Sequence, residues 1–406
     1  MERKFNELYA DIVRILRRDY AGCGEYGDRF DPRYYNQAIG QAWHDDVLDE
    51  LCFYRYVRQM LGCIGDAHLQ LELTAESGYV PEDCGFRVRR CGDSLYVTSA
   101  DAEKALPVGT RIDTINGGTL REHRATIQKD FFPASTPERE DWNELMTMAN
   151  AIGLEDGSVF TLRHYAPRSP AAGSVRFEGD AAIIRPGPFD GSGALTQRLE
   201  QYRARMKDCS RLVWDLRDTA GRDESELGEL LRYVVGQDTH AGALFGATDV
   251  YVNYSELNCR VKTALLPDTP ESESWRRLLR ENSGKGFIRE TDSAEGEPVV
   301  SYGMPQSILL LDMDCRFAGE VFAAAAMRAG AVSIGRETAG TLGYTADVRV
   351  QLDDRYILTW PTAVSAEVRD NALTPGIGLQ PALAHPWVPE ECARDLLMEE
   401  ALQIAL

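Results

Sequence analysis

A glycine-containing turn after a hydrophobic stretch is the first place where this sequence could do chemistry. Residues 212–216 are expected to form a buried strand, and Asp215-Leu-Arg-Asp-Thr-Ala-Gly221 leads from it into an expected helix. Backbone N–H groups at such a turn are well placed to stabilise a developing oxyanion. The alternative interpretation is plain architecture, because glycine turns often serve only to redirect the chain.

The histidine of Gly65-Asp-Ala-His68 is a second candidate, at the expected end of a helix and just before a strand. Histidine is the usual general base near neutral pH, and a nearby carboxylate could orient it. A structural role is the alternative. A metal site made of His44, Asp45, Asp66 and His68 is the weakest interpretation, since no HExxH-like cluster supports it. We therefore predict no metal.

The turn Asp314-Cys-Arg-Phe-Ala-Gly-Glu320 is the third candidate, between an expected strand at 308–312 and an expected helix at 318–327. In α/β hydrolytic enzymes a strand-to-helix turn of this kind presents the nucleophile. This turn contains no serine, and Cys315 is its only nucleophilic side chain. Cys315 could equally be an inert buried thiol.

A fourth segment, Gly335-Arg-Glu-Thr-Ala-Gly340, follows the strand expected at 332–334. Its glycines indicate a tight loop that lies close to a ligand or to another part of the backbone. Alone, this segment does not identify a function.

The elements that must position these segments change in type along the chain. Helical spacing of hydrophobic residues covers the first 65 residues, and a period of two begins at Leu69. Asn116-Gly117 predicts a hairpin turn, 141–151 a helix and 167–173 a linker. Further on, strands and helices alternate, which implies a mainly parallel sheet covered by helices. A hairpin is expected around Asp353-Asp354, and no elements are assigned to 239–304.

Composition and charge restrict the class of protein. The chain has 406 residues, 44% hydrophobic and 27% charged, which is typical of a soluble globular protein. Its formal charge of −20 argues against nucleic acid and anionic membranes as partners. Mixed charged sequence follows Met1, so we expect no signal peptide. Nine irregularly spaced cysteines indicate free thiols and a cytoplasmic location. No phosphate loop or dinucleotide fingerprint is present, so we expect no cofactor.

Taken together and in order, these segments resemble the tail-specific (C-terminal processing) and tricorn-type serine peptidases. This family, serine peptidase family 41, also includes the interphotoreceptor retinoid-binding repeats. The resemblance runs from about residue 5 to 390 and rests on six segments: Asp66-Ala-His68, Pro107-Val-Gly-Thr-Arg-Ile-Asp-Thr-Ile-Asn-Gly117, Asp215-Leu-Arg-Asp-Thr-Ala-Gly221, Phe317-Ala-Gly-Glu320, Gly335-Arg-Glu-Thr-Ala-Gly340 and Gly378-Leu-Gln-Pro381.

The resemblance implies an α/β fold with three parts. They are an N-terminal helical domain (1–68), a small PDZ-like β region with a helix (69–172) and a ClpP/crotonase-like βα core with a mainly parallel sheet (173–406). It also implies His68 as the base, Gly221 as the source of the oxyanion N–H, and Glu320 as part of the catalytic motif. Four further residues would contact substrate: Thr219, Thr338, Gly340 and Gln380.

Several residues depart from the family's pattern. Phe317 occupies the position of the attacking serine, three residues before the glutamate. Thr341 stands near where the tail-specific branch has its lysine base, and no lysine follows Lys285. Thr219 and Arg222 replace an asparagine and a second glycine. In the last motif, Gln380 stands where glutamate is frequent and Ala382 replaces the usual acidic residue.

Three functions are therefore compared. The first is a peptidase-like protein that binds extended polypeptide segments as an added strand, with lost or weak hydrolysis. The second is an active peptidase with His68 as base and Cys315 or another nucleophile. The third is a small apolar ligand-binding protein, as among the retinoid-binding relatives. In addition, the PDZ-like loop at Gly85-Phe86 could hold a C-terminal carboxylate.

Overall fold

The central strands of the first sheet are buried hydrophobic segments, and the candidate turns follow the ends of these strands. The computed structural model describes residues 4–26, 31–79, 82–124, 136–219, 221–246, 249–291 and 295–404. The strands of this sheet, in order across it, are β19 (Leu383–Ala384), β16 (Val332–Gly335), β15 (Ser307–Leu311), β10 (Arg211–Asp215), β9 (Ala181–Arg185) and β8 (Ser174–Glu178). Neighbours are parallel except β8 and β9, which confirms the expected mainly parallel sheet.

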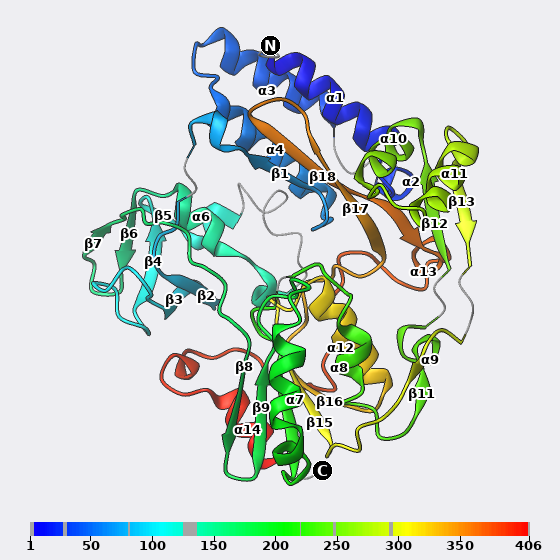
Figure 1. Ribbon diagram of the computed structural model, residues 1–406. Helices are drawn as coiled ribbons and strands as arrows, with labels where there is room; N and C mark the ends of the chain where they lie inside the picture. Colours follow the sequence, from blue (N-terminus) through cyan, green and yellow to red (C-terminus); the bar gives the residue numbers. More distant parts are fainter. Residues whose placement is uncertain are drawn as a thin grey trace.

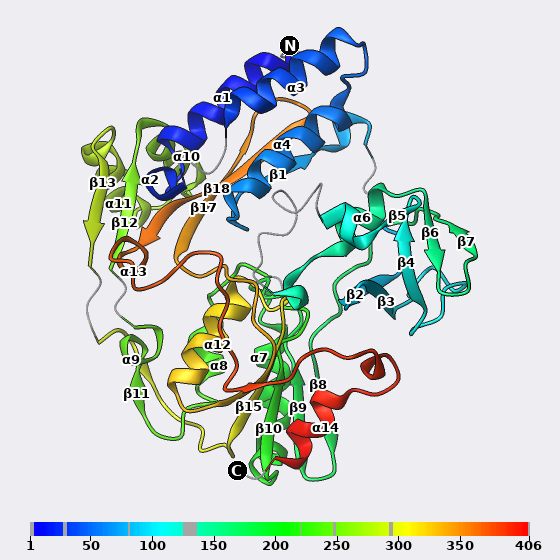
Figure 2. The ribbon, with the colours of Figure 1, turned by 180° about the vertical axis from the view of Figure 1, so that it is seen from behind.

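Helices cover both faces of this sheet, because its side chains alternate between two hydrophobic layers. On one face Trp214 packs near Phe322 of α12, with ring centres 5.0 Å apart. On the other, Val213 and Ile308 pack with Leu397 of α14, the red helix beside the sheet in Figure 2. The helices around this sheet are α7 (Ala194–Lys207), α8 (Leu227–Leu231), α9 (Ala241–Phe245), α12 (Ala318–Arg328) and α14 (Leu396–Gln403); α8 is shorter than the helix expected at 224–235.

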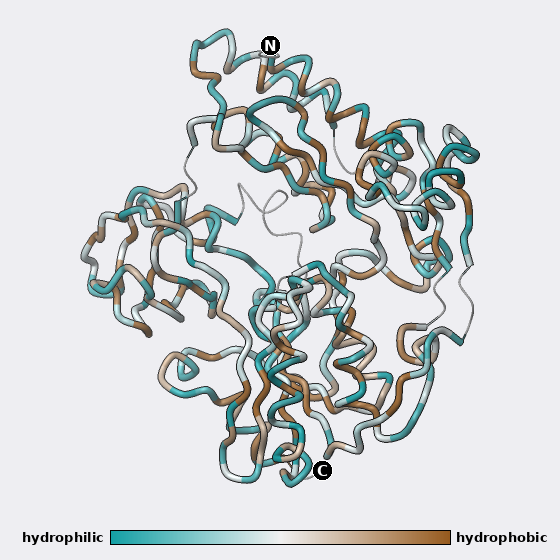
Figure 3. The backbone as a smooth tube through the Cα atoms, in the orientation of Figure 1, coloured by the Kyte–Doolittle hydropathy of each residue, from teal (hydrophilic) through white to brown (hydrophobic). Residues whose placement is uncertain are grey.

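A second sheet joins strands from distant parts of the chain. Its strands are β1 (Gln70–Leu73), β18 (Tyr356–Ser365), β12 (Val250–Tyr254) and β13 (Gly286–Glu290), with β17 (Tyr344–Gln351) paired to β18. The N-terminal helices α1 (Phe5–Arg18), α3 (Pro32–His44) and α4 (Glu50–Ile64) pack on it, and hydrophobic and hydrophilic residues alternate along them (Figure 3). Leu8 and Phe53 share one core with Leu358. The N-terminal helices therefore do not have a core of their own, and the domain boundaries remain predictions.

Residues 239–304, for which the sequence showed no pattern, supply the far strands of this second sheet. Their elements are β11 (Thr239–His240), α9, β12, α10 (Glu256–Leu265), α11 (Ser272–Asn282), β13 and β14 (Pro298–Val299). Residues 247–248 and 292–294 of this stretch lie outside the described residues. The short helices α2 (Cys23–Tyr26) and α13 (Ala366–Arg369) and the 3-10 turns η1 (Ala75–Ser77), η2 (Pro137–Arg139) and η3 (Pro389–Cys392) complete the connections.

A third sheet lies to one side, cyan in Figure 1. It contains β2 (Arg87–Cys91), β3 (Ser94–Ser99), β4 (Arg111–Ile115), β5 (Gly118–Thr119), β6 (Ala151–Leu154) and β7 (Val159–Thr161), with its own core around Trp142 of α6 (Trp142–Met148). Asn116 and Gly117 both have positive φ in the tight β4–β5 turn, as predicted. The helix expected at 141–151 ends earlier, because β6 already pairs with β4 and β7.

Candidate active site

Phe317 lies where the sequence predicts the nucleophile turn, between β15 and α12. It is the N-cap residue of α12, with φ 48° and ψ −121°, a region that bulky L-residues rarely adopt. Its backbone N–H donates to the Thr341 hydroxyl at 2.8 Å. Strained backbone of this kind persists only where the surroundings hold it, and it is frequent at functional sites. The turn between β15 and α12 thus carries a benzyl group on a strained backbone.

His68 is held at both ring nitrogens. Nδ1 lies 2.9 and 3.0 Å from the two carboxylate oxygens of Asp347, and Nε2 lies 2.8 Å from the Thr341 carbonyl. Burial alone would lower the pKa of His68, but the Asp347 hydrogen bond, the charges of Asp66 and Asp347 and the Thr341 carbonyl raise it above its ordinary value. Both nitrogens face acceptors, and Arg222 Nη1, a donor, also lies 3.3 Å from Nδ1; the ring can donate from both nitrogens when it is protonated.

Asp347 is a site residue that the sequence did not reveal. It comes from β17, 279 residues after His68, and no motif surrounds it. The preceding residue, Ala346, has φ 58°. Its carbonyl accepts from the Thr362 hydroxyl at 2.7 Å. Ala346 interrupts the regular backbone of β17 next to Asp347. This irregularity can be recognised only in the three-dimensional structure.

Arg222 completes a cluster of four side chains. Its guanidinium carbon lies 3.6 Å from the centre of the Phe317 ring, and Nη1 forms an ion pair with Asp347. The His68 ring meets the Phe317 ring edge-on, with centres 5.1 Å apart and planes at 81°. Arg222 and Phe317, the two positions at which the sequence departs from the expected motifs, therefore stack on one another.

The Glu320 side chain points into the protein and holds the loop that follows β16. Its carboxylate is fully buried and accepts hydrogen bonds from the Thr338 hydroxyl, the Gly340 N–H and both the N–H and hydroxyl of Thr341. The Thr338 hydroxyl oxygen also accepts from Leu379 N–H at 2.7 Å. Thr338 and Gly340, expected as substrate contacts, thus use these groups within the protein.

Cys315 and Thr219 lie in the protein interior, next to the turn that carries Phe317. Both are 0% exposed and form an isolated parallel bridge with one another. The Thr219 hydroxyl donates to the Leu216 carbonyl at 2.7 Å. Burial raises the pKa of the Cys315 thiol well above its ordinary value, and the charge of Glu320 adds to this. A buried, neutral thiol is a poor nucleophile, so this geometry disfavours the Cys315 alternative.

Gly221 lies beside the turn, and Gln380 is exposed. The Gly221 carbonyl accepts from Ala318 N–H at 3.1 Å, which places this glycine against the first turn of α12. A Cβ here would lie 2.0 Å from the Phe189 carbonyl oxygen, so the position requires glycine. Gln380 lies on the surface, outside the cavity of about 780 Å³ that is lined by His68, Arg222 and Phe317.

The structure does not support the weak metal interpretation. Among the described residues, no group of three or more His, Cys, Asp or Glu side chains could hold an ion. The nitrogens of His68 are already engaged, and the oxygens of Asp66 accept from the Tyr20 hydroxyl and from His68 N–H.

Two backbone donors at the loop around Gly85-Phe86 are used within the protein. The Gly85 N–H donates to the Asp83 side chain at 2.6 Å, and the Val88 N–H donates to the Asn143 side chain of α6 at 2.8 Å. These two donors are therefore not free for a peptide in this conformation.

A cavity of about 780 Å³ opens beside the Arg222–Phe317 pair. His68, Arg222 and Phe317 line one end, while Phe245, Val321 and Leu379 contribute hydrophobic wall. The volume suits a ligand of several residues.

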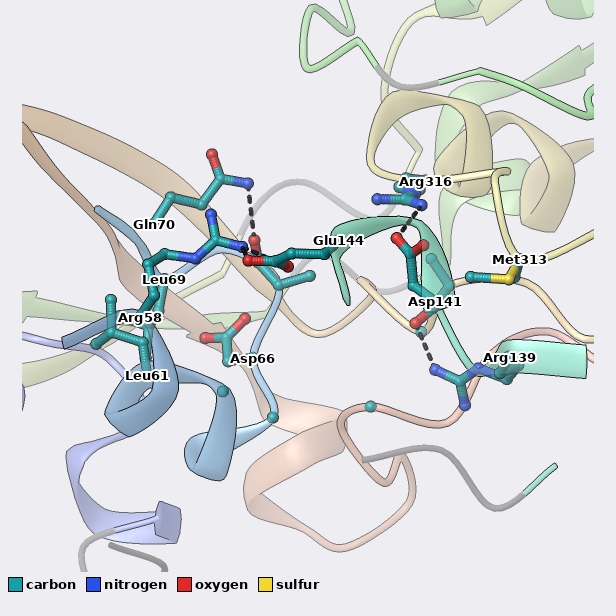
Figure 4. A pocket seen from close by; sticks show the side chains of 16 residues that line it. Arg58, Leu61, Asp66, Leu69, Gln70, Arg139, Asp141, Glu144, Met313 and Arg316 are labelled. Atoms are coloured by element: carbon teal, nitrogen blue, oxygen red, sulfur yellow. Dashed lines mark hydrogen bonds and ion pairs between the residues drawn. The ribbon is translucent and has the colours of Figure 1, made fainter. Parts of the chain in front are cut away.

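A smaller pocket of about 270 Å³ lies on the other side of the Gly65–Ala67 segment (Figure 4). It is lined by charged side chains that pair with one another. Arg58 contacts Glu144 at 2.7 Å, and Arg316 lies 4.0 Å from Asp141. Because these charges are satisfied internally, the larger cavity is the better candidate for a ligand.

Solved structures share this arrangement of elements. A serine-to-alanine mutant of CPAF has a TM-score of 0.65 at 12% identity, covering 99% of this chain and 98% of that chain. Mature CPAF in complex with lactacystin has a TM-score of 0.64 at 12% identity, covering 97% and 96%. The chain has the CPAF fold.

The photosystem II D1 C-terminal processing protease is a more distant neighbour of this CPAF-like fold, with a TM-score of 0.47 at 14% identity, covering 96% of this chain and 94% of that chain. The expected mixed α/β class is confirmed by this likeness of fold to CPAF. No protein-family model and no curated protein matches the sequence.

Proposed function

We propose that this protein binds extended polypeptide segments on a peptidase fold and has lost hydrolytic activity or retains little of it. The observation that carries the proposal is Phe317 at the N-cap of α12, covered by the Arg222 guanidinium. A phenyl ring cannot attack a carbonyl, so this turn cannot form an acyl-enzyme.

The state of His68 supports the same conclusion. A general base needs a free lone pair within hydrogen-bond distance of the proton that it removes. Here Nε2 lies 2.8 Å from the Thr341 carbonyl, and Nδ1 contacts Asp347. Cys315 offers no substitute, since it is fully buried. An active peptidase would need both a different nucleophile and a rearranged His68.

Incubation of the protein with labelled casein and a peptide library tests the proposal, with His68→Ala as the control variant. We expect no cleavage by either form, and retention of intact peptides by the wild-type protein in native mass spectrometry. Robust cleavage that His68→Ala abolishes would overturn the proposal and direct attention to an unrecognised nucleophile.

We also propose a cytoplasmic location. All nine cysteines are free thiols, as expected in a reducing compartment. Within the described ranges, every helix is too short or too polar to cross a membrane. Alkylation of the protein in intact cells, followed by mass spectrometry, tests this: oxidised cysteine pairs would contradict it.

A further inference from the structure

One edge of the first sheet is formed by β8, which pairs with β9 on one side only (Figure 1). All five residues of the strand, Ser174–Glu178, follow a regular antiparallel register with β9. Within the ranges that the structure describes, no other backbone group forms a hydrogen bond with this strand. The N–H and C=O groups that point away from β9 can therefore pair with another strand.

Other edge strands carry features that hinder pairing with a further strand. In β2 the register shifts between Arg87 and Val88, and the Val88 N–H already donates to the Asn143 side chain. In β17 the backbone is irregular at Ala346, with φ 58°. Irregularities of this kind commonly protect sheet edges. β8 has neither a bulge nor a proline nor a lysine, so its edge is not protected in these ways.

The exposed face of β8 is complementary to itself. Val175 and Phe177 pack towards α7, whereas Ser174, Arg176 and Glu178 are exposed. Arg176 and Glu178 pair with one another along the strand, and each side chain is 52% exposed. In an antiparallel pair of identical strands centred on Phe177, Arg176 of each copy would stand opposite Glu178 of the other. Centring on Arg176 would instead oppose two like charges, which is destabilising.

The opposite face supplies an aromatic contact at the same centre. The Phe177 ring lies 3.7 Å from the guanidinium carbon of Arg205, and it meets the Tyr202 ring of α7 edge-on with centres 5.6 Å apart. Tyr202 is 37% exposed. A twofold axis perpendicular to the sheet keeps each face on its own side, so the α7 helices of two copies would lie beside one another. Tyrosine and arginine side chains at the centre of an interface often dominate its binding energy.

We propose that β8 is a self-association surface, at which two copies of this chain pair their β8 strands antiparallel, centred on Phe177. The first sheet then continues from one copy into the other about a twofold axis, the commonest symmetry of protein dimers. No described residue of β8 or α7 lines the large cavity, so pairing leaves that cavity accessible in both copies. The inference is independent of the proposed function.

Sedimentation equilibrium tests the inference. We expect a species of twice the chain mass whose fraction rises with protein concentration. Arg176→Glu and Glu178→Arg should each raise the dissociation constant about ten-fold or more, because two cross-strand pairs per dimer become repulsive. The double variant Arg176→Glu/Glu178→Arg again places opposite charges together and should recover the dimer. The matched control is Arg289→Glu, on the edge strand β13 of the second sheet, which should dimerise as the wild type does.

Hydrogen exchange locates the contact. The backbone amides of 174–178 should exchange more slowly at high than at low protein concentration, and thermal unfolding verifies that each variant is folded. A wild-type protein that stays monomeric at every concentration would overturn the inference. A dimer that Arg176→Glu leaves intact, or whose β8 amides exchange at the same rate at all concentrations, would overturn it as well, since its contact would lie elsewhere.

Discussion

The guanidinium of Arg222 stacks on the ring of Phe317, with 3.6 Å between its central carbon and the ring centre. The same guanidinium pairs with Asp347, whose carboxylate holds His68. Two residues that depart separately from the peptidase motifs are therefore in direct contact. Replacing either residue removes this contact for the other, so we expect the effects of substituting Arg222 and Phe317 on stability to be coupled.

A double-mutant cycle should detect this dependence. Arg222→Met and Phe317→Leu remove the charge and the aromatic face while keeping hydrophobic volume. We expect a coupling of about 1 kcal/mol in the free energy of unfolding, the usual strength of a partly exposed cation–π contact. Urea denaturation of the wild type, both single variants and the double variant gives this quantity. Strictly additive effects would show that the stacking contributes nothing.

Placing a hydroxyl at the turn should not produce hydrolysis. In Phe317→Ser the new side chain would face a His68 whose Nε2 contacts the Thr341 carbonyl and whose Nδ1 contacts Asp347. Without a base to take its proton, serine is a weak nucleophile at neutral pH. We expect release of dye from labelled casein to stay at the level of the wild-type protein. Turnover by Phe317→Ser that His68→Ala removes would show that the histidine can act as a base.

Much of the turn region could be predicted from the sequence, because it depends on local patterns. The hydrophobic runs of β10 and β15, the Asn116-Gly117 hairpin and the position of Phe317 before α12 all follow from neighbouring residues. Glu320 was found by its spacing, but its role was not, since four hydrogen bonds to the loop at 338–341 appear only in three dimensions.

The contacts between distant segments could not be predicted. Asp347 reaches His68 from the far end of the chain, and Arg222 appeared in the sequence only as a missing glycine. The strands of 239–304 pair with β18 or with each other across long loops, and their polar composition gave no period. Without a hydrophobic period, a single sequence does not indicate which strands pair when they lie this far apart along the chain.

The buried carboxylate of Glu320 should be important for stability. In Glu320→Gln an amide nitrogen replaces one oxygen and faces hydroxyl or N–H donors of Thr338, Gly340 or Thr341. An unsatisfied buried group of this kind costs about 1–3 kcal/mol in the free energy of unfolding. Urea denaturation measures it. Glu273→Gln, on the exposed surface of α11, is the control and should cost less than about 1 kcal/mol. Equal effects of the two changes would contradict the loop-holding role.

The raised pKa of His68 predicts how stability depends on pH. Burial opposes protonation, but Asp347, Asp66 and the Thr341 carbonyl outweigh it, so the folded state binds this proton more tightly than the unfolded state. The stabilisation is complete below the unfolded pKa of about 6.5 and is lost as pH rises through the higher folded pKa. A tenfold difference in proton affinity between the two states corresponds to about 1.4 kcal/mol of stability.

We therefore expect the melting temperature of the wild type to fall relative to that of His68→Gln as pH rises above about 6.5. Comparing the two proteins at each pH removes the contribution of all other titrating groups. His44→Gln, at the exposed end of α3, is the matched control and should follow the wild type throughout. A difference between wild type and His68→Gln that stays constant with pH would mean that His68 is not held as an imidazolium, and its role as a base would again be open.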